Sequence, residues 1–341
     1  MAIKHLAEYR DPKISKGILE CIKRTVKKEV RLMEVCGTHT MSIFRSGLRA
    51  VLPNEITLIS GPGCPVCVTA QKEIDAFVEI SKLDDVIIAT FGDLLRVPGT
   101  RSTLQKERAN GRDIRIVYST FDALEIARKN QDKKVAFLGV GFETTAPTIA
   151  ASIISAQQMG LKNYFVFSAH KLVPPALERL LEVKGVRIDG FILPGHVSVV
   201  IGTKAYLPFF EQYHVPCAIA GFEPADIIQA IFTLVGQIES GSPRLENCYP
   251  RAVSFDGNWK AVKIMQDVFE LVDVDWRGIG TIPKSGLRNR KEFESFDAQK
   301  TFEFEVPESE SPKGCACGEI LTGIKIPPEC PLYEKVCTPM D

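Results

Sequence analysis

Short apolar segments alternate with amphipathic segments through the middle of the chain. Eight runs of five to seven residues, rich in β-branched or aromatic side chains, are too short for helices and are typical of buried strands. They lie at 31–35, 56–60, 85–91, 113–119, 134–140, 163–169, 190–195 and 217–222. Segments with helical spacing separate them, at 72–82, 120–130, 145–159 and 224–238. The alternation predicts βαβ units and an α/β fold built on parallel sheet.

The length of the repeating region favours two open sheets over one closed barrel. Residues 31–238 provide about 26 residues per strand–helix unit, which is near the lower bound for an eight-stranded barrel. We expect two sheets of four strands, dividing near residues 130–134. After about residue 243 the segments become polar and rich in turn residues. The predicted domains are an N-terminal helical segment, two Rossmann-like parallel-sheet domains facing a cleft, and a small loop-rich C-terminal domain, at 1–30, 31–132, 133–242 and 243–341.

Composition and charge exclude several classes of protein. The 341 residues include 42 basic and 42 acidic side chains, so the formal net charge is zero, and 45% of residues are hydrophobic. These values are ordinary for a globular protein and exclude wholesale disorder. A neutral chain is a poor match for a protein that holds nucleic-acid phosphates. No apolar run approaches the about 20 residues of a membrane span, and the charged N-terminus has no signal-peptide core. We expect a cytoplasmic protein with no nucleic-acid or membrane partner.

The segments that follow the predicted strands carry most of the reactive side chains. Ligands of parallel α/β folds bind outside the carboxyl ends of the strands, so we expect these loops to converge on one face or on a cleft between the sheets. Turns and helix caps explain many of their Gly, Pro, Thr and Asp residues. They do not explain the cysteines and histidines gathered there, which are Cys36, His39, Cys64, Cys67 and His196. Four charged residues either line the cleft or brace the loops, namely Asp93, Arg96, Glu143 and Glu223.

Cys64 and Cys67 form a CxxC motif between a predicted strand and a predicted helix. A helix N-terminus stabilises a thiolate, and CxxC thiols in this setting are typically redox-active. The competing interpretation is half of a zinc site, but no second CxxC or HxxxH motif supplies the other half. We therefore favour a redox pair. Cys36 follows the adjacent strand and is a candidate metal ligand facing the same cleft.

A second group of cysteines lies near the end of the chain. The sequence has ten cysteines, and in a reducing cytosol so many are more often metal ligands or redox thiols than disulfides. Cys315, Cys317, Cys330 and Cys337 are separated by one, twelve and six residues. Zinc knuckles usually place two to four residues between cysteines. This spacing therefore favours a [4Fe–4S] cluster over a structural zinc ion.

The ordered motifs CGTHT, GPGCPVC, FGDLLRVPG, GFETTAP, PGHVS and AGFEP, followed by CGEILTG, ECPL and VCTP, resemble the HypD family of [NiFe]-hydrogenase maturation proteins. The resemblance runs from about residue 30 to the end. It implies two α/β domains with an iron–sulfur domain, and a role in assembling the Fe(CN)2CO unit of the hydrogenase active site. It also implies work with the small chaperone HypC and receipt of cyanide from HypE, which acts with HypF.

The same resemblance assigns roles to individual positions. Cys36 matches the cysteine that holds iron jointly with a cysteine of HypC, and His39 matches the histidine of that motif. Cys64 and Cys67 match a thiol pair beside the iron. Three cluster ligands match Cys317, Cys330 and Cys337. Family members continue past VCTP with a tail that bears another cysteine, so the fourth ligand is either Cys315 or a cysteine of such a tail.

Two other functions use the same residues differently. A [4Fe–4S]-linked protein disulfide reductase would share the cluster and the CxxC motif but would not need Cys36. A zinc-stabilised binding scaffold would use its thiols only structurally. Soft thiolate favours iron, and a low-potential cluster near a disulfide can supply electrons one at a time. We therefore expect a redox-active scaffold of metallocentre assembly.

Overall fold

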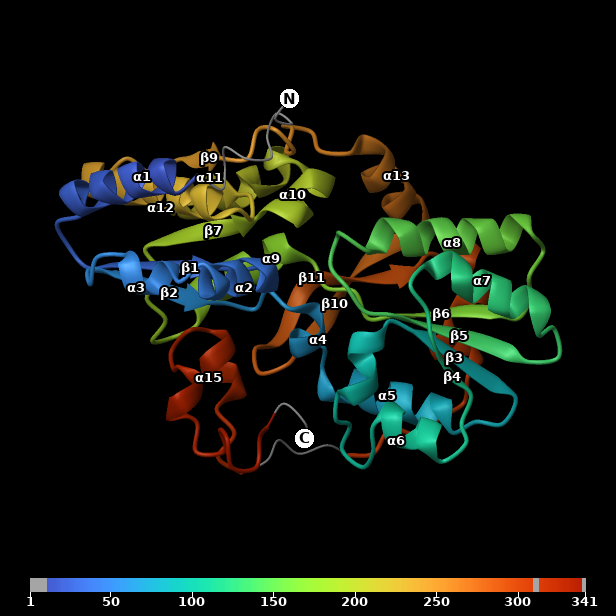
Figure 1. Cartoon of the computed structure of the whole chain (residues 1–341). Coiled ribbons are helices and arrows are strands. Elements are labelled where there is room, and N and C mark those ends of the chain that lie inside the picture. Colours follow the sequence, from blue (N-terminus) through green and yellow to red (C-terminus); the bar gives the residue numbers. More distant parts are fainter. Residues whose placement is uncertain (1–10, 309–312, 339–341) are drawn as a thin grey trace. The chain divides into compact units, whose positions relative to one another are not determined.

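The computed structural model describes residues 11–308 and 313–338, and it shows an α/β protein organised in two compact units (Figure 1). Unit 1 comprises the residues up to Cys64 together with Ala176–Trp259 and Glu319–Ile324. Unit 2 comprises Pro65–Pro175, Lys260–Gly318 and the residues from Lys325 onward. The chain therefore passes between the units more than once.

The described part of unit 1 is built on a five-stranded sheet in which neighbouring strands pair in parallel, in the order β2-β1-β7-β8-β9. Its strands are β1 (Val30–Glu34), β2 (Ile56–Ser60), β7 (Gly190–Pro194), β8 (Cys217–Ala220) and β9 (Leu245–Asn247). The strands β1, β7 and β8 are almost wholly buried. Short apolar strands of this kind are expected where helices cover a parallel sheet.

Helices connect and cover this sheet (Figure 1). They are α1 (Pro12–Thr25), α2 (Gly37–Arg45), α3 (Leu48–Val51), α10 (Gly195–Ile201), η3 (Thr203–Tyr206), α11 (Leu207–Tyr213) and α12 (Pro224–Ser240), and α9 (Val173–Glu182) crosses the boundary with unit 2. The longest, α12, packs against α1 and β8. Its Ile227, Ile231 and Leu234 are fully buried in one core with Leu32 of β1 and Ile192 of β7. This core fixes the positions of β1, β7 and β8, whose carboxyl ends precede the loops of the site described below.

Unit 2 contains, in its described residues, a four-stranded sheet of order β4-β3-β5-β6 whose neighbouring strands are again parallel. Its strands are β3 (Val86–Thr90), β4 (Ile114–Ile116), β5 (Lys134–Gly139) and β6 (Tyr164–Ser168). Its helices are α4 (Pro65–Val68), α5 (Gln71–Ser81), η2 (Gly92–Arg96), α6 (Leu104–Ala109), α7 (Thr120–Lys129) and α8 (Ala146–Gln158).

The later part of unit 2 adds an antiparallel hairpin of β10 (Phe269–Trp276) and β11 (Gly280–Asn289). Its remaining elements are α13 (Trp259–Val268), η4 (Lys291–Phe296), α14 (Ala298–Thr301), α15 (Cys317–Leu321) and η5 (Pro327–Glu329), with the first residue of α13 and the end of α15 counted in unit 1. Trp276 is fully buried and donates its indole N–H to the Ser285 hydroxyl, at 2.9 Å. Phe269 and Leu287 of the hairpin belong to the same buried core as Phe137 of β5, so the hairpin packs onto the sheet of unit 2.

The prediction of two parallel-sheet Rossmann-like folds is confirmed, and each of the eight apolar runs contains a strand. The strands are nevertheless distributed differently from the expected division near residues 130–134. Strands β1 and β2 join β7 and β8, while β3 to β6 form the other sheet. Hydrophobic periodicity identifies a strand but not its partner, because pairing depends on long-range packing. Residues 243–341 are also less dominated by loops than predicted, since they contain β9, α13 and the hairpin.

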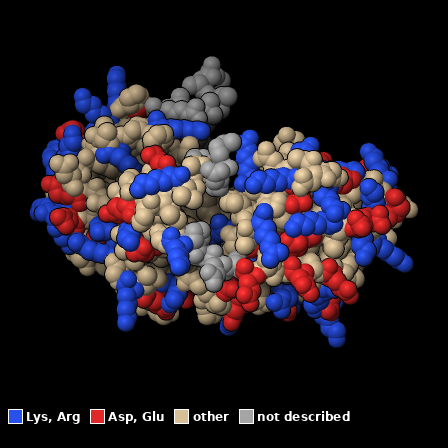
Figure 2. All heavy atoms as spheres, turned by 90° about the horizontal axis from the view of Figure 1, so that it is seen from below, with Lys and Arg blue, Asp and Glu red and all other residues tan. Residues whose placement is uncertain are grey.

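The surface and the helices add two observations. Basic and acidic side chains are interspersed across the face shown in Figure 2, and such mixing keeps the local electrostatic potential small. Within residues 11–308 and 313–338, no helix combines the length and the apolar character needed to span a bilayer.

Candidate functional site

The carboxyl edge of the unit 1 sheet brings together several of the predicted site residues. Strands β2, β1, β7 and β8 are neighbours and run in parallel, so the loops that follow them leave from the same edge. These loops carry Cys64, Cys36, His196 and Glu223 in that spatial order. The predicted convergence of loops therefore holds for this set of residues within unit 1.

Two glycines allow the loops bearing Cys36 and Cys64 to touch. A Cβ on Gly63 would fall 2.2 Å from the backbone N of Cys36 and 2.4 Å from its Cα. The amide of Gly37 donates to the Gly63 carbonyl at 2.9 Å. A Cβ on Gly37 would lie 3.8 Å from the Cβ of Cys64. The glycines of the CGTHT and GPGCPVC motifs thus place the two cysteines beside each other.

Cys36 is held at the N-terminus of α2, where it is the N-cap residue. Its side chain is buried, with 9% relative exposure. Burial raises the pKa of the Cys36 thiol, and the amides of His39 and Thr38 oppose this shift. The amides at the start of α2 therefore offset part of the cost of forming the thiolate at this buried position.

Glu34 is a buried acidic residue beside Cys36 that the sequence analysis did not single out. It ends β1 with no exposed surface. Its carboxyl accepts hydrogen bonds from the Cys36 amide, at 3.2 Å, and from the Thr40 hydroxyl, at 2.5 Å. Burial raises the pKa of Glu34 to about 7. The signal available in the sequence was an acidic side chain inside the otherwise apolar end of the RLMEV run.

His39 and His196 flank the ring of Phe222. The centroid of the Phe222 ring lies 4.8 Å from that of His39 and 3.9 Å from that of His196. His39 Nε2 donates to the Gly221 carbonyl at 2.9 Å, so Nδ1 is the unprotonated nitrogen. Nδ1 is buried and has no hydrogen-bond partner among the described residues. Burial lowers the pKa of His39 to about 4, and the ring is therefore neutral at pH 7.

Glu223 also lies at this edge of the sheet, where it is the N-cap residue of α12. Its amide donates a hydrogen bond to the carboxylate of Asp226 at 3.2 Å, and Arg251 donates to both oxygens of that carboxylate at 2.7 and 2.6 Å. These contacts brace the start of α12 through the backbone of Glu223 and the side chain of Asp226.

Three of the predicted lining residues belong to unit 2, whereas Cys36 belongs to unit 1. Asp93 and Arg96 are exposed on η2, after β3. Glu143 follows β5 and is almost fully buried, and its Oε1 accepts from the Val173 amide at 2.9 Å. Its Oε2 has no hydrogen-bond partner in the described part of the chain. Burial raises the pKa of Glu143 to about 7.

The CxxC motif spans the boundary between the units, because unit 1 includes Cys64 and unit 2 begins at Pro65. Cys64 is half-buried and Cys67 is exposed. Cys67 lies in the single-turn helix α4, whose end is tied down by hydrogen bonds from the Thr69 hydroxyl and amide to the Pro65 carbonyl, at 2.8 and 3.1 Å. An exposed thiol on a short, fixed helix is accessible to thiol–disulfide exchange.

The four late cysteines come near one another within unit 2. Burial raises the pKa of Cys317, and the neighbouring thiols of Cys315, Cys337 and Cys330 add to that shift. Hydrogen bonds from backbone amides, foremost that of Ala316, lower the pKa of Cys330. No group of three or more His, Cys, Asp or Glu side chains among the described residues is arranged to hold a single metal ion. Cysteines and amide–sulfur hydrogen bonds are the donor set of an iron–sulfur cluster, whose thiolates bind separate irons. The residues present fit that group.

Comparisons with known proteins agree on one family. The HypD family model, described as "Hydrogenase formation hypA family", matches residues 13–341. The hydrogenase maturation factor HypD2 of Bradyrhizobium diazoefficiens is 43% identical over 99% of this chain and 91% of its own length. The hydrogenase maturation factor HypD of Rhizobium leguminosarum bv. viciae is 43% identical over 99% of this chain and 90% of its own length. The factor of the same name from Escherichia coli K12 is 41% identical over 99% and 92%.

Proposed function

The chain belongs to the HypD family of hydrogenase formation proteins, and we propose that it is a cytoplasmic scaffold and redox centre for assembling the Fe(CN)2CO unit of a [NiFe]-hydrogenase. The observation that carries this proposal is the contact between the Cys36 and Cys64 loops at the carboxyl edge of the unit 1 sheet. One thiol there can hold iron while its neighbour takes part in redox chemistry.

Cys36 is the proposed ligand of the iron that is being assembled. A second thiolate comes from a HypC-type chaperone, so the iron is shared between the two proteins. The amides of Thr38 and His39 favour the thiolate of Cys36, which is a soft ligand suited to iron. The adjacent rings of His39, Phe222 and His196 offer an aromatic wall at the same sheet edge, and such a wall reduces access of water to bound cyanide and CO. Cyanide is delivered by HypE acting with HypF.

Cys64 and Cys67 are the proposed redox pair. Reduction of their disulfide breaks the S–S bond, consumes two electrons and two protons, and yields two thiols. A low-potential one-electron donor of the ferredoxin class supplies both electrons. Cys315, Cys317, Cys330 and Cys337 are the residues proposed to hold a [4Fe–4S] cluster. When bound, such a cluster supplies one-electron transfer at low potential.

The test is infrared spectroscopy of the chain purified anaerobically with a HypC-type partner. We expect iron-bound cyanide and CO bands in the native complex and in Cys21→Ala, a control on α1 of the same unit. Cys36→Ala should lose the bands while still binding the partner. Bands of normal intensity in Cys36→Ala would exclude the proposed iron ligand. If that variant also retained full activity in reducing a partner disulfide, a cluster-linked disulfide reductase would be the better description.

A further inference from the structure

The turn between β10 and β11, residues Trp276–Gly280, contacts both the segment of α4, which bears Cys67, and the start of α15, which bears Cys317. All of these contacts lie within unit 2. The turn is therefore the element that connects one thiol of the proposed redox pair to the proposed cluster ligands.

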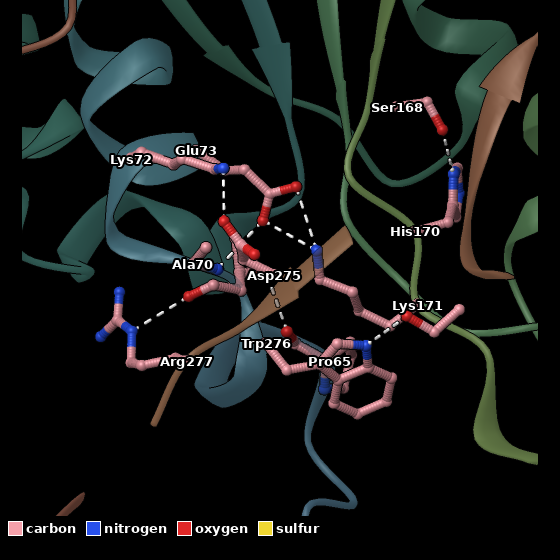
Figure 3. Close-up of polar contacts among 12 residues, drawn as sticks. Pro65, Ala70, Lys72, Glu73, Ser168, His170, Lys171, Asp275, Trp276 and Arg277 are labelled. Carbon is pink, nitrogen blue, oxygen red and sulfur yellow. Dashed lines mark hydrogen bonds and ion pairs between the residues drawn. The ribbon is translucent and has the colours of Figure 1, made fainter. Parts of the chain in front are cut away.

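Arg277 makes the contacts with the first of these elements. Its amide donates to the Val68 carbonyl at 2.8 Å. Its Nε donates to the Thr69 carbonyl at 3.0 Å, which is the dashed line drawn from Arg277 in Figure 3. Trp276 and Thr69 also form an isolated antiparallel bridge. Val68 and Thr69 have no exposed surface. The end of α4, one residue beyond Cys67, is thus fixed to the turn by backbone and side-chain hydrogen bonds.

Gly278 makes the contacts with the second element. It has a φ of +73°, and a Cβ there would fall 2.6 Å from the Cα of Gly318. A Cβ on Gly318 would in turn fall 2.3 Å from the Gly278 carbonyl oxygen. The backbone just after Cys317 therefore lies directly on the turn, and only glycine at both positions allows this approach.

The guanidinium of Arg277 also has hydrogen-bonding capacity that its backbone contacts do not use. Its Nη2 is buried and has no hydrogen-bond partner among the described residues. The charge of Arg277 is close enough to Cys317 to interact with it electrostatically. A buried N–H donor beside a sulfur ligand is an arrangement that tunes the potential of an iron–sulfur site.

We propose that Arg277 couples the two thiol sites of unit 2, because it fixes the end of α4 to the turn on which the start of α15 lies and places a fixed positive charge near Cys317, one of the four cysteines. This inference rests on the proposed function. Arg277 is a positioning residue, since it acts through Cys317 and through α4. A fixed positive charge stabilises the more reduced, more negative state of a nearby centre, and Arg277 therefore raises the reduction potential of the four-cysteine site.

The experiment compares four variants of the full chain after anaerobic reconstitution with iron and sulfide. Arg277→Gln removes the charge, and Arg277→Lys keeps the charge but loses the Nε contact. Gly278→Ala keeps Arg277 but forces the start of α15, at Gly318, away from the turn. Gly280→Ala is the matched control, because Gly280 also has a positive φ, of +90°, but a Cβ there would meet nothing within 4 Å.

Two quantities are measured, namely the reduction potential of the iron–sulfur signal and the rate at which reduced ferredoxin converts the Cys64–Cys67 disulfide to thiols. Arg277→Gln should lower the potential, whereas Arg277→Lys should leave it near that of the native chain. Gly278→Ala should slow disulfide reduction by about tenfold or more, since a misplacement of about 1 Å can cost about 100-fold. Gly280→Ala should match the native rate.

The outcomes separate this inference from the function on which it rests. If a folded, cluster-loaded Arg277→Gln protein had the native reduction potential, the role of Arg277 would be only structural. That result would overturn this inference but not the proposed function. Equal rates for Gly278→Ala and Gly280→Ala would overturn the coupling through the turn. A native chain that carries no iron–sulfur signal after reconstitution would overturn the proposed redox centre, and the role of Arg277 with it.

Discussion

Replacing Glu73 with glutamine should be among the most destabilising single changes in unit 2, because it leaves the ammonium of Lys171 buried without an anion. The Lys171 side chain has no exposed surface, and its Nζ lies 3.0 and 2.9 Å from the two carboxylate oxygens of Glu73 (Figure 3). Glu73 also accepts the Ala70 amide at 3.0 Å, at the start of α5. The pair therefore joins α5 to the segment after β6.

The expected magnitude follows from the burial of the pair. Removing one partner of a buried ion pair costs about 3–5 kcal/mol, mainly because the remaining charge is left unpaired and out of water. Replacing both partners by neutral groups of similar volume costs far less. We therefore expect Glu73→Gln to lose about 3–5 kcal/mol of unfolding free energy. The double variant Glu73→Gln, Lys171→Met should recover most of that loss, since glutamine can still accept the Ala70 amide.

The assay is urea unfolding followed by tryptophan fluorescence, because Trp276 is fully buried in the same unit. The control is Lys72→Met, which breaks the ion pair between Lys72 and Asp275. That pair is exposed, with 62% and 35% of the two side chains accessible, and exposed pairs contribute about 0–1 kcal/mol. A loss below about 1 kcal/mol in Glu73→Gln, or a double variant as unstable as the sum of the single variants, would refute the reasoning.

Three other predictions concern pH, packing and redox state. Burial raises the pKa of Glu143 from 4.5 to about 7, so the folded chain binds the proton more tightly and stability falls as pH rises through this window. Between pH 4.5 and 8, the unfolding free energy of the native chain should therefore fall by about 3 kcal/mol more than that of Glu143→Gln. Urea unfolding at several pH values measures this difference. Gly63→Ala should cost about 1–3 kcal/mol through overpacking and should remove the infrared bands of iron-bound cyanide. Cys64 and Cys67 should form a reversible disulfide, which mass spectrometry after thiol alkylation in defined redox buffers can detect.

Each of these predictions has a control and a contrary result. A pH dependence of Glu143→Gln equal to that of the native chain would contradict the buried-carboxyl explanation. Gly17→Ala is the packing control for Gly63→Ala, because a Cβ at Gly17 meets nothing within 4 Å. Equal losses in these two variants would argue against the contact between the cysteine loops. The redox role would lose its support if Cys64 and Cys67 stayed unlinked under conditions that oxidise exposed control thiols.

The local pattern of apolar and polar residues determined much of the secondary structure of this protein. Apolar run length and helical spacing located eight of the nine described strands of the two parallel sheets and the main helices, because strands buried on both faces of a parallel sheet are rich in apolar residues. The position of reactive residues directly after strands predicted that the loops bearing Cys36 and Cys64 would lie at one sheet edge, because the carboxyl ends of parallel strands meet there. Motif order was enough to indicate the family.

Tertiary structure decided which segments meet. The chain returns to the first sheet at β7, after four strands of the second sheet, and no local periodicity encodes that return. It places His196 and Glu223 beside Cys36 and leaves Asp93, Arg96 and Glu143 in the other unit. The burial of Glu34, the pairing of Glu73 with Lys171 and the contacts of Arg277 likewise depend on segments far apart in sequence. The reason is physical. The burial of a side chain and its electrostatic partners depend on how the whole chain packs, whereas helix propensity and hydrophobic spacing depend only on residues close in sequence.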